Sequence, residues 1–338
     1  MEGQTKQYFQ TLDALRGVAA LAVMVFHAPT LGGRFVPSGY LAVDLFFMLS
    51  GVVIAQAYHR RMADGLAIRS FLYRRFTRLW PMLALGAALG ILLHQGHAGS
   101  LLLLPNWKSE LNLYPSNPPM WSLLMEALAY LAFACGLWRA GPRVLAAIAL
   151  ASGAILAVQI LTSPSLFFEF GAHWMTLGGG LARVAFGFST GMLLWHIWRR
   201  TGATRTPSQG GWLAIAAALI VMALVPLDEG LTALAVLFLV FPAIIWWALT
   251  REIPQTRAAR ALGDLSYPLY CIHMPILVAF APEQEKALLF CLVLPSIALA
   301  CARMVDAPVR RFLSTKLPEI GRSNSAPVYL TARTRKRG

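Results

Sequence analysis

Ten apolar runs follow one another along this chain of 338 residues. They lie at about 12–31, 40–58, 79–96, 119–138, 144–161, 177–198, 211–226, 230–250, 266–281 and 286–302. A helix of about 20 apolar residues crosses the hydrocarbon core of a bilayer, and polar flanks or local thinning complete shorter spans. Charged residues make up 13% of the chain, whereas about 25% is typical of soluble domains. We therefore predict an all-α, polytopic membrane helix bundle of about ten transmembrane helices.

The basic residues fall on alternate sides of these runs. If the N-terminus starts in the cytoplasm, only Arg34, Lys108 and Lys286 of the 29 basic residues fall outside, while Arg16 and Arg183 lie within spans. This is the positive-inside bias, which predicts that both termini are cytoplasmic. The bias also accounts for the net charge of +14, so we expect membrane lipids and no nucleic acid among the partners.

The chain shows no internal repeat and no sign of a second folded domain. We expect one membrane domain over residues 1–314. Residues 315–338 are polar and basic and lack an apolar face, which predicts a disordered cytoplasmic tail near anionic headgroups. The proline-rich segment 97–118 is predicted to form an irregular external lid over the mouth of the bundle.

Three ionisable residues share one stripe of the first run: Asp13, Arg16 and His27. At about 100° per residue, Arg16 lies roughly 20° to one side of His27 and Asp13 lies about 40° to its other side. A charge facing lipid costs roughly 2.5–3.5 kcal/mol, so intramembrane charges usually face a polar interior and mark a functional path. This helix is therefore predicted to line a site.

Other ionisable residues fall at a matching depth in other runs. His27 and Asp44 lie roughly 6 Å inside the outer ends of their predicted helices, and Glu126 and Arg183 roughly 10 Å inside theirs. Intramembrane ion pairing is one interpretation. The other is catalysis: a carboxylate can orient a histidine and stabilise its imidazolium, which makes the ring a general base. Asp44 or Glu126 could be that carboxylate, and the sequence does not choose between them.

The cytoplasmic segment 59–78 contains an amphipathic stretch from Leu66 to Arg78. It is interpretable as an interfacial helix whose arginines extend to the headgroups. The spacing of Arg75 and Arg78, at i and i+3 on one helix face, favours phosphate recognition instead. A pair of planar guanidinium groups can bind phosphate oxygens bidentately.

Several common site types find little support in the sequence. His94 and His97 have no carboxylates at ligand spacing, so we expect no metal site. A Walker-type nucleotide loop and a G-x-S-x-G elbow are both lacking, which argues against an ATP-driven pump and a serine hydrolase.

Six motifs in order resemble those of acyltransferase family 3, the bacterial integral-membrane acyltransferases. They are Leu12-Asp-Ala-Leu-Arg-Gly17 with His27, Val43-Asp-Leu-Phe-Phe-Met-Leu-Ser-Gly51, Arg74-Arg-Phe-Thr-Arg-Leu-Trp-Pro81, Trp121-Ser-Leu-Leu-Met-Glu126 with Tyr130, Arg183-Val-Ala-Phe-Gly187, and Leu262-Gly-Asp-Leu-Ser-Tyr267 with Tyr270 and His273. The resemblance covers about residues 8–312. This sequence departs from the family pattern at Val52, at Ala129 and at Asp306. In Asp306-Ala-Pro308, the family more commonly has Glu at the first position.

The resemblance implies a multi-pass enzyme of the bacterial cytoplasmic (inner) membrane that takes an acyl group from cytosolic acyl-CoA. The resemblance also implies no bound cofactor and acyl-CoA, by default acetyl-CoA, as a co-substrate. The acyl group goes to a hydroxyl at the outer face, on a glycan, a lipid-linked sugar or a glycosylated small molecule. Arg16 and His27 match the family's transfer element, Arg75 and Arg78 its donor element, and Glu126 its essential carboxylate.

We thus predict an acyl-CoA-dependent O-acyltransferase. The predicted catalytic residues are His27, Glu126 and Asp44, and the predicted donor-binding residues are Arg16, Arg75 and Arg78. Supporting polar residues are Asp13, Arg183, Ser122, Tyr267 and His273. His27 would act as a general base or carry the acyl group covalently. The alternative function is a proton-coupled secondary transporter that uses the same intramembrane residues as a relay.

Overall fold

A computed structural model describes residues 9–28, 31–163, 170–202, 206–224, 229–280 and 284–315. Its helices are α1 (Gln10–His27), α2 (Gly32–Phe35), α3 (Ala42–Ala63), α4 (Ile68–His94), α5 (Met120–Cys135), α6 (Pro142–Thr162), α7 (Leu177–Thr201), α8 (Gly211–Ala223), α9 (Glu229–Ala235), α10 (Phe241–Thr250), α11 (Arg257–Phe280), α12 (Gln284–Cys301) and α13 (Ala307–Thr315). Short 3₁₀ turns are η1 (Gly39–Leu41), η2 (Ala98–Leu102), η3 (Leu137–Arg139) and η4 (Trp174–Thr176). The predicted all-α class is confirmed.

Each of the ten apolar runs is helical over most of its described residues. Within the described residues, six helical segments are long and apolar enough to cross a membrane: Gly39–Ala63, Ile68–His94, Pro142–Thr162, Trp174–Thr201, Gly230–Thr250 and Lys286–Thr315. Met120–Cys135 and Gly211–Ala223 are shorter apolar helices. The chain is therefore a multi-pass helical membrane protein, whereas ten crossings and cytoplasmic termini remain predictions. The predicted tail lies outside the described residues, except for Thr315.

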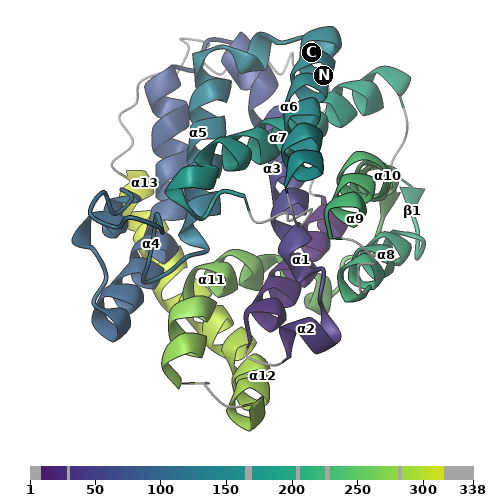
Figure 1. Cartoon of the computed structure of the whole chain (residues 1–338). Coiled ribbons are helices and arrows are strands. Elements are labelled where there is room, and N and C mark those ends of the chain that lie inside the picture. Colours follow the sequence, from purple (N-terminus) through teal and green to yellow (C-terminus); the bar gives the residue numbers. More distant parts are fainter. Residues whose placement is uncertain are drawn as a thin grey trace, which may run out of the picture.

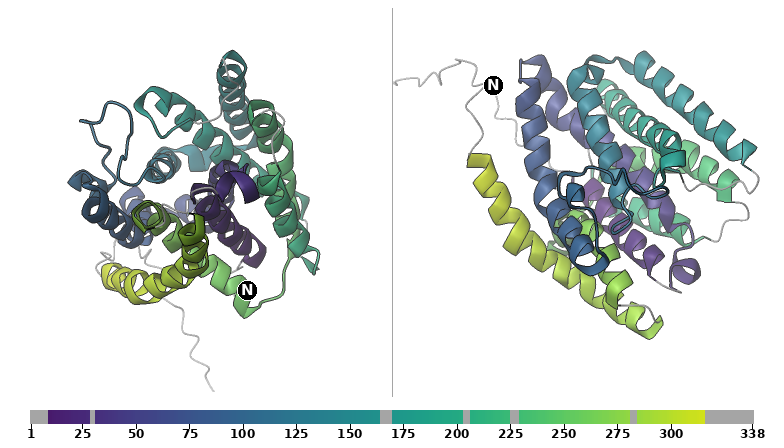
Figure 2. Two further views of the ribbon diagram at one scale, coloured as in Figure 1. Left: turned by 60° about the horizontal axis from the view of Figure 1, so that its bottom comes forward. Right: turned by 60° about the vertical axis from the view of Figure 1, so that its left-hand side comes forward.

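Helix α1 lies inside the bundle, in contact with α3, α8, α10 and α11, and most of its residues are buried (Figures 1 and 2). Its first turn is held by a distant segment. The backbone N–H of Gln10 donates to Glu252 Oε1 at 2.5 Å, and the Thr11 hydroxyl donates to the Arg251 carbonyl at 2.8 Å. Arg251–Glu252 forms β2, which pairs in parallel with β1 (Thr206–Pro207). The two-residue pair thus fixes the start of α1.

Helix α1 ends at His27, so His27 lies at the end of its helix and not roughly 6 Å inside it, as the length of the apolar run predicts. The reason is local. Ala28 is extended, with φ −73° and ψ 127°, and it precedes Pro29, whose ring disfavours the helical conformation in the residue before it.

The amphipathic stretch 66–78 is not a separate interfacial helix. From Ile68 onward it forms the first part of α4, which continues without a break through Pro81 to His94. Its arginines therefore project from a helix that packs against α5, α11 and α13. Figure 2 shows α12 and α13 running along the edge of the bundle beside α4.

Two single turns of π-helix interrupt the regular helices: η5 (Val236–Val240) and η6 (Ala302–Asp306). Each ends two residues before a proline, Pro242 or Pro308. Proline lacks the N–H that would bond the carbonyl four residues back and its ring crowds that carbonyl, so the helix widens locally. In η6 the wider turn carries Asp306, which is 5% exposed.

The segment 97–118 is largely irregular, as predicted. Asn112 forms an isolated antiparallel bridge with His173, and the rings of Trp107 and Trp174 lie 4.7 Å apart. The Tyr114 hydroxyl donates to the Leu103 carbonyl at 2.6 Å, and burial raises the pKa of Tyr114. The contacts of Asn112 and Trp107 attach the segment to the turn that precedes α7.

Candidate active site

Two hollows lie along the same part of the bundle. The first, which we call the central cavity, has a volume of about 440 Å³ between α1, α3, α5 and α11. The second, which we call the arginine cleft, has a volume of about 930 Å³ between α3, α4 and α13. The central cavity is lined by Arg16, Val43, Phe46, Phe47, Ser122, Leu123, Glu126, Ser266, Tyr267 and Tyr270. The arginine cleft is lined by Tyr58, Arg74, Arg75, Thr77, Arg78, Ala307, Arg310, Arg311 and Ser314.

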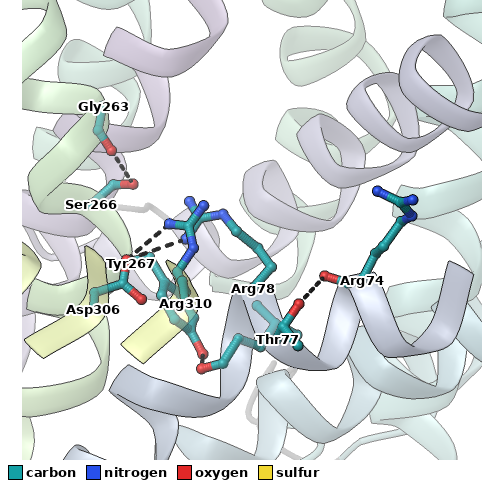
Figure 3. Close-up of polar contacts among 9 residues, drawn as sticks. Arg74, Thr77, Arg78, Gly263, Ser266, Tyr267, Asp306 and Arg310 are labelled. Atoms are coloured by element: carbon teal, nitrogen blue, oxygen red, sulfur yellow. Dashed lines mark hydrogen bonds and ion pairs between the residues drawn. The ribbon is translucent and has the colours of Figure 1, made fainter. Parts of the chain in front are cut away.

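The arginine cleft carries a large excess of positive charge. Helix α4 contributes Arg74, Arg75 and Arg78, and helix α13 contributes Arg310 and Arg311. One carboxylate lies at its edge. Figure 3 shows Asp306 facing Arg78 and Arg310, with N–O distances of 3.8 Å and 3.0 Å respectively. A cluster of guanidinium groups with so little compensating negative charge is suited to a polyanionic ligand such as a phosphate ester.

Arg78 is held at the boundary between the cleft and the central cavity. Its guanidinium carbon lies 5.6 Å from the centre of the Tyr267 ring, and the Tyr267 hydroxyl donates to the Leu79 carbonyl at 2.6 Å (Figure 3). Tyr267 also lines the central cavity. The predicted supporting residue Tyr267 is therefore in contact with a predicted donor-binding residue.

A chain of hydrogen bonds joins the arginine cleft to the central cavity. Arg75 Nη2 donates to the Tyr130 hydroxyl at 2.6 Å, and its guanidinium carbon lies 4.4 Å from the centre of the same ring. The Tyr130 hydroxyl donates in turn to Glu126 Oε1, and the Ser50 hydroxyl donates to that oxygen at 2.8 Å. Arg75 Nε is buried and has no hydrogen-bond partner among the described residues.

Glu126 and Arg16 both line the central cavity. The hydroxyls of Ser50 and Tyr130 both donate to Oε1 of Glu126. Oε2 accepts no hydrogen bond from the part of the chain that the structure describes. Arg16 likewise has no hydrogen bond or ion pair within the described segments. The cavity therefore contains an acceptor and a cationic donor, each able to contact a bound molecule.

Ser122 and Tyr270 close the cavity between α5 and α11. Their side-chain oxygens lie 2.5 Å apart, and both hydroxyls are within hydrogen-bond distance of the Pro119 carbonyl, at 3.0 Å and 3.1 Å. The predicted supporting residue Ser122 thus lies in the site. Its contact with Tyr270 holds the start of α5 against α11.

The stripe on α1 faces α11 along its length. Arg16 lines the central cavity, and the Asp13 side chain packs so closely on Gly263 that a Cβ there would lie 3.1 Å from Asp13 Cβ. His27 Nδ1 lies 3.1 Å from His273 Nε2. The prediction that this helix lines a site is consistent with the structure.

The ring of His27 contacts His273, and the expected carboxylate is elsewhere. Glu126 binds Ser50 and Tyr130, and Asp44 binds Arg183. The expectation that one of these carboxylates supports His27 therefore finds no contact among the described residues. Sequence reasoning placed His273 among the supporting residues but did not pair it with His27, because the pairing depends on how α1 and α11 cross.

Asp44 and Arg183 form a buried ion pair, the alternative that the sequence left open. Arg183 Nε and Nη2 donate to the two carboxylate oxygens at 3.0 Å and 2.7 Å, and Nη1 donates to the Phe170 carbonyl at 2.9 Å. The guanidinium carbon lies 5.0 Å from the centre of the Trp121 ring. A catalytic role of Asp44 stays a prediction.

Sequence reasoning gave no role to several residues of the site. Tyr130 follows Glu126 by four positions, which places the two on one helix face. Asp306 and Arg310 have the same spacing, with Arg311 next to them. Those spacings are visible in the sequence. The hydrogen bond from Ser50 to Glu126 is not visible there, because the two residues lie on different helices.

The model of the acyltransferase domain family, acyltransferase family 3, matches residues 9–302. The peptidoglycan O-acetyltransferase OatA of Listeria monocytogenes is 24% identical over an alignment that covers 91% of this chain and 56% of that protein. "Protein 2 in picA locus" of Rhizobium radiobacter is 44% identical over 90 residues, which cover 26% of this chain and 47% of that protein.

The chain thus spans about half the length of these curated relatives. No solved structure matches it.

Proposed function

Because this chain belongs to acyltransferase family 3, we propose that it is a membrane-embedded O-acyltransferase that uses acyl-CoA as its donor. The observation that carries the proposal is the hydrogen-bond chain from Arg75 through Tyr130 to Glu126, which joins the arginine cleft to the central cavity. A donor with a phosphate-rich end and a long neutral arm requires such a pair of joined compartments.

The phosphates of the donor bind in the arginine cleft. Arg75 and Arg78 supply guanidinium groups from α4, and Arg310 and Arg311 supply them from α13. The unpartnered Nε of Arg75 is one donor that a phosphate oxygen would satisfy. This extends the predicted donor site by two residues from the last described helix.

The pantetheine arm then extends through the central cavity, past Arg16 and Glu126, toward His27. Arg16 and His27 lie about 16 Å apart along α1, at a rise of 1.5 Å per residue. The Glu126 side chain is positioned by the hydroxyls of Ser50 and Tyr130, and Tyr130 connects it to Arg75. It orients the neighbouring polar groups of the cavity, and Arg16 interacts with the donor.

At the far end His27 removes the proton of an acceptor hydroxyl. The hydroxyl oxygen attacks the thioester carbonyl carbon, the new C–O bond forms, and the C–S bond breaks with its electron pair on sulfur. The CoA thiolate takes up a proton, and His27 returns the one it accepted to solvent. Covalent transfer through His27 is the variant of this route in which the ring attacks first.

The acceptor is a glycan hydroxyl at the outer face, and the acyl group is acetyl. The OatA relative carries the name of a peptidoglycan O-acetyltransferase, which supports an O-linked glycan acceptor for this chain. We place the protein in the bacterial cytoplasmic membrane with the arginine cleft on the cytoplasmic side.

Donor binding tests the first half of this proposal. Acetyl-CoA binding to the purified full chain in lipid nanodiscs is measured for wild type and for Arg75→Ala/Arg78→Ala. We expect at least a tenfold rise in Kd. The matched control, Arg60→Ala/Arg69→Ala, removes two exposed arginines and is expected to bind normally. Equal binding by all three proteins would refute the arginine cleft as the donor site and would favour a transporter.

Transfer tests the second half. Membranes with equal amounts of wild type and His27→Ala are supplied with radiolabelled acetyl-CoA, and label in the glycan fraction is followed. We expect a loss of about 10²–10⁴-fold, the usual contribution of a general base. Turnover near the wild-type rate would remove His27 from the chemistry.

A further inference from the structure

The two histidines at the far end of the site come from helices that are remote in the sequence. His27 is the last residue of α1, and His273 lies within α11, where it is 0% exposed. Their ring centres are 5.1 Å apart with an angle of 37° between the planes. A close crossing of α1 and α11 brings them together, since a Cβ on Gly17 would lie 2.3 Å from the Leu262 carbonyl oxygen.

The surroundings of His273 decide which of its nitrogens carries the proton. Nδ1 lies 3.1 Å from the Leu269 carbonyl oxygen and 2.9 Å from the Tyr270 carbonyl oxygen. A carbonyl only accepts hydrogen bonds, so Nδ1 must be the N–H. In the neutral ring, Nε2 is then an acceptor, and it is this atom that faces His27.

The surroundings of His27 lead to the same tautomer for this ring. Its Nδ1 lies 3.0 Å from the Val23 carbonyl oxygen and 3.1 Å from His273 Nε2. Both of these atoms are acceptors, so His27 Nδ1 carries a proton and shares it between them. The lone pair of the neutral His27 ring therefore lies on Nε2, to which no donor is found in the described part of the chain.

We infer that His273 is a positioning residue that holds His27 as a base with its lone pair on Nε2. When Nε2 takes the proton of the acceptor hydroxyl, Nδ1–H keeps its hydrogen bond to His273, so the imidazolium is stabilised where it forms. In a serine hydrolase triad a carboxylate has this role toward its histidine. A neutral second histidine has it here without bringing another charge into the membrane interior.

His273 lies next to a residue that lines the central cavity. Tyr270, one turn earlier on α11, lines the cavity, and its ring centre lies 5.8 Å from that of His273. The Tyr270 carbonyl fixes the His273 tautomer, and the Tyr270 hydroxyl contacts Ser122 on α5. The tautomer of His27 is thus tied to the packing of α5 on α11.

The catalytic role inferred for His273 rests on the proposed function, whereas the tautomer assigned to His27 does not. Two variants of His273 separate the effect of its hydrogen-bond acceptor from the effect of its side-chain volume. His273→Gln can place Oε1 near the position of Nε2, whereas His273→Phe fills the space without an acceptor. His94→Phe is the control, because His94 Nε2 also contacts an α11 carbonyl, that of Pro275, at 2.9 Å but does not touch His27.

The first readout is ¹⁵N NMR of histidine-labelled protein in nanodiscs, with the His27 signals assigned by their loss in His27→Ala. In wild type we expect a protonated, pyrrole-type Nδ1 and a pyridine-type Nε2. In His273→Phe we expect a mixture of both tautomers, and in His94→Phe the wild-type pattern. An Nε2–H tautomer in wild type, or an unchanged pattern in His273→Phe, would overturn the inference.

The second readout is steady-state transfer. His273→Phe is expected to lower kcat at least tenfold with KM for the donor unchanged, His273→Gln to retain most of kcat, and His94→Phe to leave both values as in wild type. Equal kcat in His273→Phe and wild type would overturn the positioning role. If wild type has the expected tautomer but transfers no acyl group, the proposed function fails while the assignment of the tautomer stands.

Discussion

Arg183 and Asp44 face each other through two parallel hydrogen bonds at 3.0 Å and 2.7 Å, with 4% and 1% of their side chains exposed. Arg183 comes from the seventh position of α7 and Asp44 from the first turn of α3. The pair joins two helices that also approach closely at Gly191, where a Cβ would lie 2.0 Å from the Met48 carbonyl oxygen. The ion pair thus includes Asp44, one of the carboxylates that the sequence predicts to be catalytic.

Removing one partner of this pair leaves an uncompensated buried charge. We expect Asp44→Leu and Arg183→Leu each to lower the free energy of unfolding by about 3–5 kcal/mol. The double variant Asp44→Leu/Arg183→Leu should recover most of that loss, because it buries no charge. Unfolding in mixed detergent micelles measures this. If the double variant regains stability but lacks acyl transfer, Asp44 has the catalytic role predicted from the sequence; full activity would exclude it.

The Tyr130 hydroxyl is the single link between Arg75 and Glu126 in the described structure. We expect Tyr130→Phe to lower kcat by about 10- to 100-fold, since it leaves a buried guanidinium and a carboxylate each short of a partner. Donor Kd should change much less. Tyr73→Phe is the control, because it removes another hydroxyl of this region, one that donates to the Leu313 carbonyl at 3.0 Å. Equal kcat for the two variants would contradict the coupling.

Asp306 pairs with Arg78 and Arg310, so under the proposed function it competes with a donor phosphate for both guanidinium groups. We expect Asp306→Asn to lower the Kd for acetyl-CoA by about three- to tenfold, up to 1.4 kcal/mol, because the charge that opposes the ligand is removed. High salt should weaken acetyl-CoA binding by both proteins but change the gain from Asp306→Asn little, because Asp306 is buried and salt screens mainly exposed charges. Binding isotherms at two salt concentrations test this. The control Asp64→Asn removes an exposed carboxylate that pairs with Arg60. A higher Kd for Asp306→Asn would show that Asp306 supports the cleft.

Gly191 permits the close approach of α7 to α3. A methyl group there meets the Met48 backbone, which cannot rotate away, so Gly191→Ala is expected to cost about 1–3 kcal/mol of unfolding free energy. Gly178→Ala on the same helix meets nothing within 4 Å and should be neutral or slightly stabilising. The thermal midpoints of the two purified variants make the comparison. Equal midpoints would contradict the packing described here.

The helices of this protein were predictable because each one is encoded locally. Every apolar run became a helix, and the stripe of Asp13, Arg16 and His27 faces α11 and the central cavity. The i, i+3 spacing of Arg75 and Arg78 placed both in one cleft. Helical periodicity and the cost of charge in lipid suffice for such predictions. Helix α1 ends before the apolar run does, because Pro29 disfavours the helical conformation in the residue before it.

What the amino-acid sequence determined by itself is the set of helices and which of their faces are polar, because both follow from neighbours within a few residues. Only the tertiary structure decided the partners: Asp44 with Arg183, Glu126 with Ser50 and Tyr130, and His27 with His273. Several ionisable groups at one depth admit many pairings of similar energy. The pairing that forms depends on which helices cross closely, and crossings such as that of α1 and α11 at Gly17 are fixed by packing across hundreds of residues.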